Sequence, residues 1–388
     1  MRFVAIALLP ALLLTLSACG SNTARNDTNT PPETADATPE ASAPAEDRTL
    51  PAPLGDYRAA SLSGDYAGYP DTVELITRLH EQHGYDETYL YGLFSRVERQ
   101  QWILDYLNRP KSRGKSPPGS WSRYRKKFLT DSRLRKGLEF WDLHTAELER
   151  ASERFGVPPE YVVAIIGVET NYGRNFGSHK VIEALSTLAF DYPRRAEFFT
   201  GELEQFLLMA REEGWDPFQP VGSYAGAMGL GQFMPSSFHN YAVDFDGDGV
   251  RDLWNPTDAI GSVANYFAGH GWRSGEPVAL TARALGQGAE LMDAGYNSRY
   301  SPALLEQKGV FTSLPMDPES EVSLIRLSTY SGPEYWVGLH NFYVITRYNH
   351  SSYYAMAVHQ LAQSLANART QTRGPILSLD NRPQPPVN

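Results

Sequence analysis

The sequence predicts a mainly α fold of the α+β class, and two features of its 388 residues favour this class. Apolar side chains recur at helical spacing from Tyr66 to about residue 276, and again from Ala355 to Ala368. Between these regions, residues 277–346 alternate apolar and polar side chains and are rich in β-branched and aromatic types. We interpret them as a small antiparallel β domain with strands near 278–282, 322–327 and 335–346, and short helices at 289–294 and 301–308.

Residues 1–19 have the features of a targeting signal and not of a folded element. Arg2 precedes an apolar run from residue 4 to residue 16, which ends in the letters LSAC with Cys19 last. This ending resembles the bacterial lipobox, in which the cysteine is lipidated; an ordinary signal peptide is the alternative. Gly20 follows, and in the Gram-negative sorting pattern this implies the outer membrane. We therefore expect a lipid anchor on Cys19 at the periplasmic face of the outer membrane.

Composition limits the remaining function classes. Cys19 is the only cysteine, so a disulfide and a thiol-based catalytic or zinc site are excluded. No apolar run after residue 20 is long enough to span a bilayer. The net charge of −10 argues against nucleic acid as a partner. Residues 20–65 and 374–388 lack the apolar side chains of a core, so we expect a disordered tether and a disordered tail.

Helices are expected throughout the first half of the folded region. The first carries Val73, Ile76 and Leu79 at helical spacing, with Asp71 as its N-cap. The others span residues 86–101, 138–155 and 180–189, and a further helix ends near Glu213, before Gly214 and Pro217.

Residues 109–136 form a strongly basic stretch, with eleven Lys or Arg and one acid, Asp131. Such a run is usually a solvated surface. The alternative is a surface along which an anionic or sugar-bearing polymer lies, with Tyr124 supplying a ring face.

The stretch from Phe155 to Thr170 predicts a buried helix that ends in a carboxylate. Pro158 and Pro159 suit its first turn, and nearly every side chain from Tyr161 to Val168 is apolar. Glu169 follows this run, so burial should raise the pKa of its carboxyl. A protonated carboxyl at neutral pH can act as a general acid, whereas the alternative is a residue that only caps the helix or forms a salt bridge.

Two further stretches carry candidate binding residues. From Ser223 to Pro235, glycines and small residues alternate with Met and Leu, which permits close backbone approach; Ser223 and Gln232 are the polar side chains. A tightly packed contact between helices is the alternative. Later, a helix places Ile260 and its periodic neighbours toward the core, whereas Tyr266 falls outside that stripe and can face a groove. Residues 348–352 cap the last helix.

Residues 244–258 resemble an EF-hand calcium loop. Carboxylates occupy loop positions 1, 3 and 5, glycine occupies position 6, and the carbonyl of position 7 is the next ligand. Position 12 is Asn255 and not the usual Glu, so Asp258 is the candidate closing ligand. The predicted ligands of a structural Ca²⁺ are therefore Asp244, Asp246, Asp248, Val250 and Asp258. An acidic turn without a metal is the alternative.

Together these motifs resemble the lytic murein transglycosylase B family of the lysozyme-like superfamily. The matching stretches are residues 167–173, 193–199, 223–235, 244–272 and 347–349. The resemblance implies a lysozyme-like helical core, an added helical domain, a small antiparallel β domain and a calcium loop, all within residues 66–373. It implies Glu169 as the catalytic acid. The glycan groove would be lined by Tyr124, Arg194, Arg195, Ser223, Gln232, Tyr266, Tyr348 and Asn349, and Phe198 stands where the family has a groove tyrosine.

The activity that the resemblance implies is cleavage of the β-1,4 bond between N-acetylmuramic acid and N-acetylglucosamine without water, which leaves 1,6-anhydromuramic ends. One carboxyl, Glu169, would serve as acid and then as base, and no cofactor is expected for the chemistry. A hydrolytic muramidase and a non-catalytic murein-binding lipoprotein are the alternatives. The expected partners are peptidoglycan strands, the membrane and cell-wall synthesis or remodelling proteins, and we expect a monomer.

Overall fold

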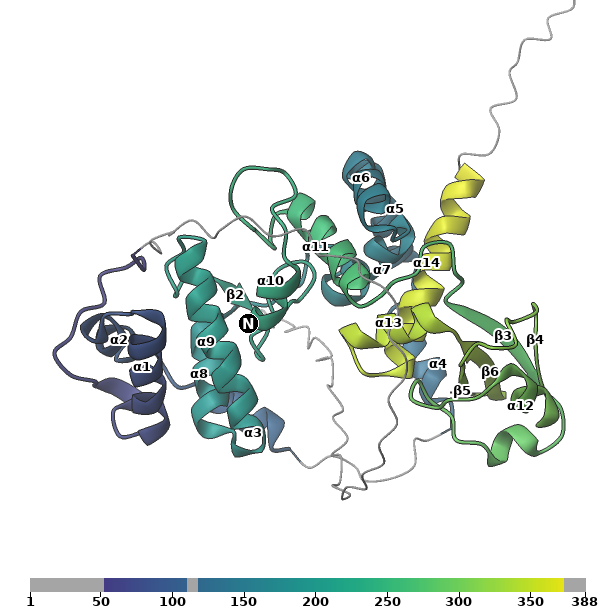
Figure 1. Cartoon of the computed structure of the whole chain (residues 1–388), viewed down its shortest axis with the longest axis horizontal. Coiled ribbons are helices and arrows are strands. Elements are labelled where there is room, and N and C mark those ends of the chain that lie inside the picture. Colours follow the sequence, from purple (N-terminus) through teal and green to yellow (C-terminus); the bar gives the residue numbers. More distant parts are fainter. Residues whose placement is uncertain (1–51, 110–117, 373–388) are drawn as a thin grey trace, which may run out of the picture.

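The computed structural model describes residues 52–109 and 118–372, and it is mainly helical with one small sheet (Figure 1). The helices before residue 220 are α1 Pro70–His83, α2 Glu87–Phe94, α3 Gln101–Leu107, α4 Ser120–Arg125, α5 Asp131–Leu143, α6 Thr145–Phe155, α7 Pro159–Thr170, α8 Val181–Asp191 and α9 Ala196–Glu212. The later helices are α10 Pro235–Tyr241, α11 Pro256–Gly269, α12 Pro302–Gln307, α13 His340–Tyr348 and α14 Ser352–Thr372. Short 3-10 turns are η1 Gly64–Tyr66, η2 Pro193–Arg195 and η3 Gly288–Leu291.

Helix α7 lies at the centre of the core. Its side chains from Tyr161 to Val168 are buried, and helices α5, α6, α11 and α14 contact it. Two features fix its length. Pro159 opens its first turn, and Asn171 ends it in the left-handed conformation with φ 52°. The predicted all-round burial of this helix is confirmed, and Glu169 lies in its last turn.

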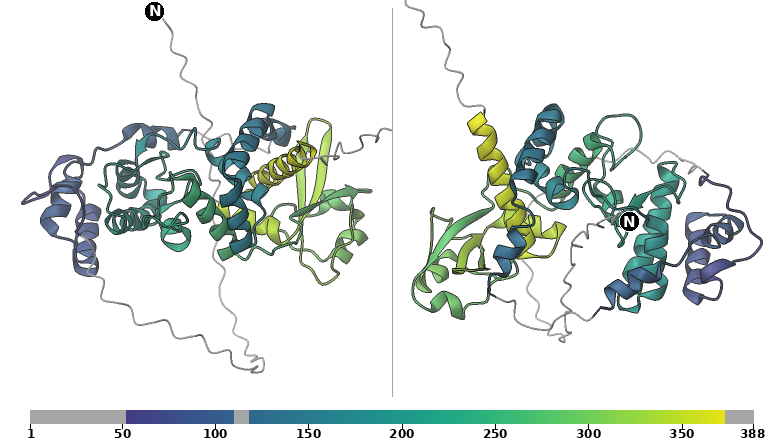
Figure 2. Two further views of the ribbon diagram at one scale, coloured as in Figure 1. Left: turned by 90° about the horizontal axis from the view of Figure 1, so that it is seen from above. Right: turned by 180° about the vertical axis from the view of Figure 1, so that it is seen from behind.

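Helices α8 and α9 form a second helical unit, to which α1 and α2 attach (Figures 1 and 2). Helix α8 is buried along almost its whole length. Helix α1 is held to α9 by an ion pair between Arg78 and Glu204, with 2.7 Å between nitrogen and oxygen. The Tyr85 hydroxyl, at the start of the α1–α2 connection, donates to the Leu207 carbonyl of α9 at 2.6 Å.

The β domain is one antiparallel sheet of four strands in the order β4-β3-β6-β5. The strands are β3 Ala279–Ala284, β4 Val310–Thr312, β5 Ser323–Thr329 and β6 Gly332–Gly338. Leu305, Val310, Leu324 and Val337 form a small core under the sheet. A separate pair, β1 His179–Lys180 and β2 Val221–Gly222, connects the α8–α9 unit to the loop that follows it.

Several predicted helix boundaries were wrong. Helix α1 begins at Pro70, so Asp71 lies in the first turn and is not the N-cap, and Val73 of the predicted stripe is 47% exposed. The helix predicted over 86–101 ends at Phe94. Its continuation is prevented because the backbone N–H groups of Arg99 and Gln100 donate to Asp65 and Thr187 instead.

The helix predicted over 138–155 is two helices, and the first begins earlier. The Thr130 side chain caps α5, accepting from the N–H of Arg133. His144 breaks the run with φ −116°, and the Thr145 hydroxyl bonds the Trp141 carbonyl at 2.8 Å. This kind of hydroxyl bond competes with the helical ladder and bends helices.

The β domain also departs from the prediction. It has four strands and not three, because Val310–Thr312 was missed. The strand predicted over 335–346 is correct only to Gly338, and residues 340–348 form helix α13. The helix predicted over 289–294 is the short turn η3, whereas the helix predicted over 301–308 is confirmed as α12.

The folded part begins earlier than the predicted tether allowed. Tyr57 is buried in the core and its hydroxyl donates to Asp216 at 2.6 Å. Residues 1–51, with the targeting signal, Cys19 and most of the predicted tether, lie outside the described residues, as do the basic residues 110–117 and the tail 374–388. In the described part of the chain, no helix is long and apolar enough to cross a membrane.

Candidate active site

Glu169 is partly exposed at the C-terminal end of α7, and many protein atoms surround its carboxyl. Burial raises the pKa of this carboxyl from 4.5 to about 7, against a smaller lowering by the Tyr354 hydroxyl, which donates to Glu169 Oε1 at 2.5 Å. No charged group within residues 52–109 and 118–372 is among the causes of the shift. The site thus contains a single carboxyl that binds and releases a proton near neutral pH.

Four tyrosines surround Glu169. Burial is the largest cause that raises the pKa of each phenol, and the charge of Glu169 raises it further. The four residues are Tyr124, Tyr266, Tyr348 and Tyr354. The rings of Tyr348 and Tyr354 are nearly parallel, with their centroids 6.5 Å apart. The ring centroids of Tyr266 and Tyr348 are 4.7 Å apart. The phenols therefore stay protonated and can donate hydrogen bonds, but they cannot act as bases near pH 7.

Hydrogen bonds fix the end of α7 that carries Glu169. Arg133 of α5 donates from Nη1 to the carbonyl of Gly167. The Thr170 hydroxyl lies 3.0 Å from the Leu230 carbonyl of the glycine-rich loop and accepts the N–H of Gly173 at 3.0 Å. Since these contacts immobilise the residues on both sides of Glu169, the carboxyl is presented in one orientation.

The stretch 223–235 is a turn-rich loop, so the alternative of a contact between helices is wrong for it. Met228 and Phe233 exchange both backbone hydrogen bonds, and the Tyr348 hydroxyl donates to the Gly231 carbonyl at 2.5 Å. Gln232 adopts φ 54°, and its amide donates to the Phe176 carbonyl at 3.1 Å. The loop can lie this close to Tyr348 because residue 231 is a glycine. A Cβ at this position would be 2.9 Å from the Tyr348 hydroxyl oxygen.

The other predicted groove residues are in less direct positions. Ser223 accepts the N–H groups of Ala225 and Ala227, so its oxygen stabilises the loop. Asn349 follows Tyr348, is 6% exposed, and its side-chain amide makes no hydrogen bond with the part of the chain that the structure describes. Arg194 is exposed on η2. Arg195 stacks on Phe198, with its guanidinium carbon 4.0 Å from the ring centroid.

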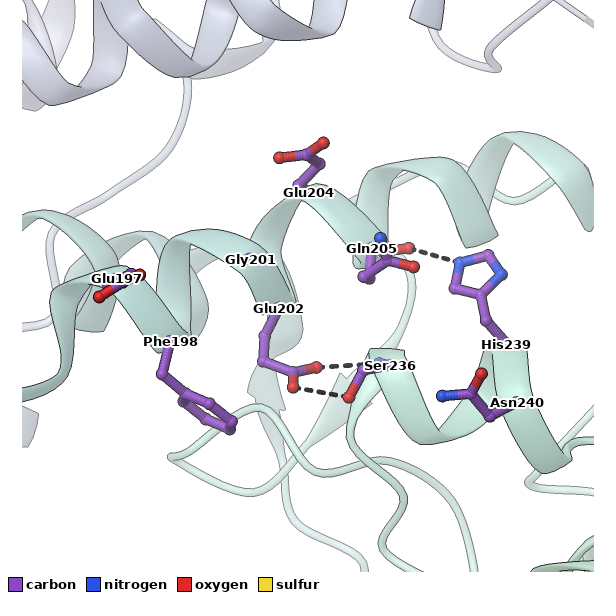
Figure 3. Close-up of a pocket in the computed structure, with 9 residues that line it drawn as sticks. All are labelled: Glu197, Phe198, Gly201, Glu202, Glu204, Gln205, Ser236, His239 and Asn240. Carbon is purple, nitrogen blue, oxygen red and sulfur yellow. Dashed lines mark hydrogen bonds between the residues drawn. The ribbon is translucent and has the colours of Figure 1, made fainter. Parts of the chain in front are cut away.

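A surface hollow of about 750 Å³ lies between α9 and α10 (Figure 3). Phe198 lines it, together with Glu202, whose carboxylate accepts both the N–H and the hydroxyl of Ser236. Apart from Phe198, which stands at a predicted groove position, none of the predicted site residues lines this hollow. The candidate active site is therefore the tyrosine-rich surface around Glu169.

The predicted calcium loop gathers three of its carboxylates. Oxygens of Asp244, Asp246 and Asp258 lie within 4.8 Å of one another. Asp258 is 1% exposed, and desolvation raises the pKa of its carboxyl. Asp248 is not in this group, and its Oδ1 accepts the N–H of Val250. The residues present fit a hard cation, because these three carboxylates offer oxygen ligands, which suit Ca²⁺.

A profile of the transglycosylase SLT domain family matches residues 69–363. The chain belongs to this family. Membrane-bound lytic murein transglycosylase B of Escherichia coli strain K12 is 44% identical over 377 residues, 94% of this chain and 98% of that protein. The Escherichia coli lytic transglycosylase SLT35 in complex with calcium is 48% identical, with a TM-score of 0.76 over 80% of this chain and 97% of that one. SltB3 of Pseudomonas aeruginosa in complex with NAG-anhNAM-pentapeptide is 33% identical, with a TM-score of 0.67 over 76% and 78%.

One residue of this transglycosylase site was missed in the sequence. Tyr354 lies on α14 among Ala355, Met356 and Val358, and all four side chains are fully buried. A tyrosine in an apolar helical run is usually core. The only available signal was that its hydroxyl needs a partner when buried, and in the fold this partner is Glu169.

Proposed function

We propose that this chain cleaves the β-1,4 bond between N-acetylmuramic acid and N-acetylglucosamine in peptidoglycan and leaves a 1,6-anhydromuramic end. The observation that supports this most strongly is the single carboxyl, Glu169, whose pKa is about 7, among protonated tyrosines. The family membership of the chain supports the same conclusion.

Glu169 carries both proton transfers. In its protonated form it donates its proton to the glycosidic oxygen, so the bond from the muramic C1 breaks and the leaving sugar gains a hydroxyl. The carboxylate that results then accepts the proton of the C6 hydroxyl of the same muramic acid, as that oxygen bonds to C1. The Tyr354 hydroxyl stabilises the carboxylate between the two steps through its hydrogen bond. Atoms and charge balance, and Glu169 ends protonated.

The internal hydroxyl is favoured over water for a physical reason. Hydrolysis with one acid requires a base or a carboxylate on the opposite face of the sugar. No charged side chain among the described residues perturbs Glu169, and the phenols around it are held in their protonated form. A well-placed internal hydroxyl has an effective concentration of about 10⁵ M or more, far above the ~55 M of water.

Groove residues and the metal complete the proposal. The Asn349 amide makes no hydrogen bond within the described part of the chain, so it can orient the substrate acetamido group or Glu169. Tyr124, Tyr266 and Tyr348 offer ring faces to sugars, and Arg194, Arg195, Ser223 and Gln232 extend the groove. A Ca²⁺ held by Asp244, Asp246 and Asp258, with Asp248 and the Val250 carbonyl turned toward it on binding, would hold the loop 244–258 to α11. Its role is structural.

The proposed location is the periplasmic face of the outer membrane, with lipid on Cys19 and residues 20–51 as the tether. This is supported by the LSAC sequence and by the membrane-bound relative. Incubation of the purified protein with murein sacculi tests the proposed activity. Anhydro products are expected, whereas reducing products would favour a muramidase and an absence of products would favour a murein-binding lipoprotein.

A further inference from the structure

A second hollow lies where the β5–β6 hairpin meets α4, and Figure 1 shows these elements next to each other. It has a volume of about 410 Å³ and is lined by Pro118, Arg326, Ser328, Thr329, Tyr330, Gly332 and Pro333. Tyr330 at the tip of the hairpin is 61% exposed, which is unusual for a large aromatic side chain. None of the residues assigned to the active site lines this hollow.

The β5–β6 hairpin is held to α4 by specific contacts. The N–H of Gly119 donates to the Ser328 hydroxyl at 3.2 Å, and the N–H of Tyr330 donates to the Ser122 hydroxyl at 3.3 Å. Gly119 has φ 75°, and a Cβ at this position would approach the Tyr330 ring to 2.3 Å. The close approach of the ring therefore depends on a glycine, so the hairpin and the helix form one surface.

This surface is positively charged. The Lys126 ammonium lies 5.6 Å from the centroid of the Tyr330 ring, and the Arg123 guanidinium carbon lies 5.9 Å from it. Arg326 is exposed at the wall of the hollow. Within residues 52–109 and 118–372, no salt bridge joins Lys126 or Arg326 to a carboxylate. In a chain with a net charge of −10, the positive charges of Lys126 and Arg326 at this surface fit an anionic ligand.

The same helix connects this surface to the active site. Tyr124, whose phenol is affected by the charge of Glu169, lies between Arg123 and Arg125 on α4. Residues 123 and 126 share the face of α4 that meets Tyr330, and residue 124 lies on the neighbouring face. Helix α4, about 10–12 Å in diameter, therefore borders both the active site and the hollow.

We propose that the hollow between α4 and the β5–β6 hairpin binds the peptide attached to a muramyl residue in the groove. This inference rests on the proposed function. Such a peptide carries free carboxylates, which suit Lys126 and Arg326, and its backbone and side chains can lie against the Tyr330 ring. A stem of four residues extends at most about 14 Å, which is enough to cross α4. The site would thus favour peptide-bearing strands over bare glycan.

The test compares two soluble, uncrosslinked glycan substrates, one with its peptides and one from which an amidase has removed them. The full-length variant Lys126→Gln/Arg326→Gln should raise KM for the peptide-bearing strands about tenfold, a factor equivalent to ~1.4 kcal/mol of binding, with kcat unchanged. KM for the bare strands should not change. Lys126→Arg/Arg326→Lys keeps both charges and should retain the wild-type KM on both substrates.

A matched control removes two charges at the opposite edge of the sheet. Arg283 on β3 and Lys308 before β4 are exposed, and neither forms a salt bridge in the described part of the chain. Arg283→Gln/Lys308→Gln should leave KM unchanged on both substrates. Melting temperatures of all variants verify that each is folded.

Other outcomes overturn the inference. An equal KM of wild type and Lys126→Gln/Arg326→Gln on peptide-bearing strands would contradict it, as would an equal rise on both substrates or with the control pair. If Lys126→Gln/Arg326→Gln weakens only the binding of the protein to vesicles that contain phosphatidylglycerol, the surface binds the membrane and not the peptide. If the wild type forms no anhydro ends from peptide-bearing strands, the proposed function itself fails, which is a separate result.

Discussion

At the scale of residues, the chemistry depends on the environment of one carboxyl. The sequence predicted Glu169 because a charged side chain after an apolar run must be paired or protonated, and burial does raise its pKa to about 7. The sequence could not predict Tyr354, which is 185 positions away on another helix. Contacts of this kind depend on the packing of helices, whereas the spacing of Tyr354 within α14 only indicates a buried residue.

Glu169→Gln removes the proton but keeps the shape of the side chain, so we expect turnover on murein sacculi to fall by about 10²–10⁴-fold. Solubilisation of sacculi measures this, and a variant with a tenth of wild-type activity would contradict the assignment.

Because burial raises the folded-state pKa of Glu169 above 4.5, the stabilisation by the bound proton is fully present below about pH 4.5 and lost as the pH rises through 7. At pH 8 the variant should therefore be about 1–3 kcal/mol more stable than the wild type, and near pH 4 equally stable.

The pH profile of kcat/KM tests the contact between Tyr354 and Glu169. Activity requires the protonated acid, so the wild type should lose activity as the pH rises past about 7. The Tyr354 hydroxyl lowers the Glu169 pKa by stabilising the carboxylate. Tyr354→Phe should therefore shift the alkaline limb to higher pH. Tyr353→Phe is a matched control, since its hydroxyl bonds Ser120 and not Glu169; an unshifted limb in Tyr354→Phe, or the same shift in both variants, would count against the assignment.

At the scale of elements, spacing predicted some segments well and others poorly. Helix α7 and the loop 244–258 carry local patterns that need no tertiary information. The helix has the expected form, whereas the loop gathers three of its four predicted carboxylates, Asp244, Asp246 and Asp258. The prediction of a strand over residues 335–346 was wrong beyond Gly338, because the aromatic and β-branched residues of this segment suit a strand and an amphipathic helix equally. The chain changes from β6 to α13 after Gly338, and Phe342 and Ile345 of α13 are then buried.

The loop 244–258 should bind Ca²⁺ and stabilise the fold. A cation that binds only the folded state adds stability, about 2.7 kcal/mol at a hundredfold excess over its dissociation constant. Melting temperatures with excess calcium and with a chelator measure this contribution. Asp246→Ala should abolish the difference, whereas Glu153→Ala removes an exposed carboxylate on α6, outside the loop, and should preserve it. Identical melting temperatures of the wild type in both conditions would eliminate the metal site.

At the scale of the whole molecule, the family resemblance predicted the mainly helical fold, the β domain and their order. The start of the folded part was placed too late, because residues 52–65 contain few large apolar side chains and Tyr57 is buried by contacts with residues distant in sequence, among them Tyr89, Asp216 and Phe218. A single anchoring residue in a polar segment leaves no periodic pattern.

Cys19→Ser tests the proposed anchor. We expect this variant to appear in the soluble periplasmic fraction or to remain an unprocessed precursor, because the serine hydroxyl cannot receive the thioether-linked lipid. Cell fractionation and immunoblotting follow the protein, and Ser17→Ala is a control that keeps the cysteine and should stay with the membrane. Retention of processed Cys19→Ser in the membrane fraction would refute the anchor.

The origin of the atom that bonds to the muramic C1 tests the central claim most directly. Sacculi are digested in water labelled with heavy oxygen, and the muropeptides are analysed by mass spectrometry. The C6 hydroxyl should supply the new bond, so the products should lack the mass of one water, carry no heavy oxygen at C1 and resist reduction by borohydride. A predominance of reducible muramic ends that carry heavy oxygen would show that Glu169 directs hydrolysis.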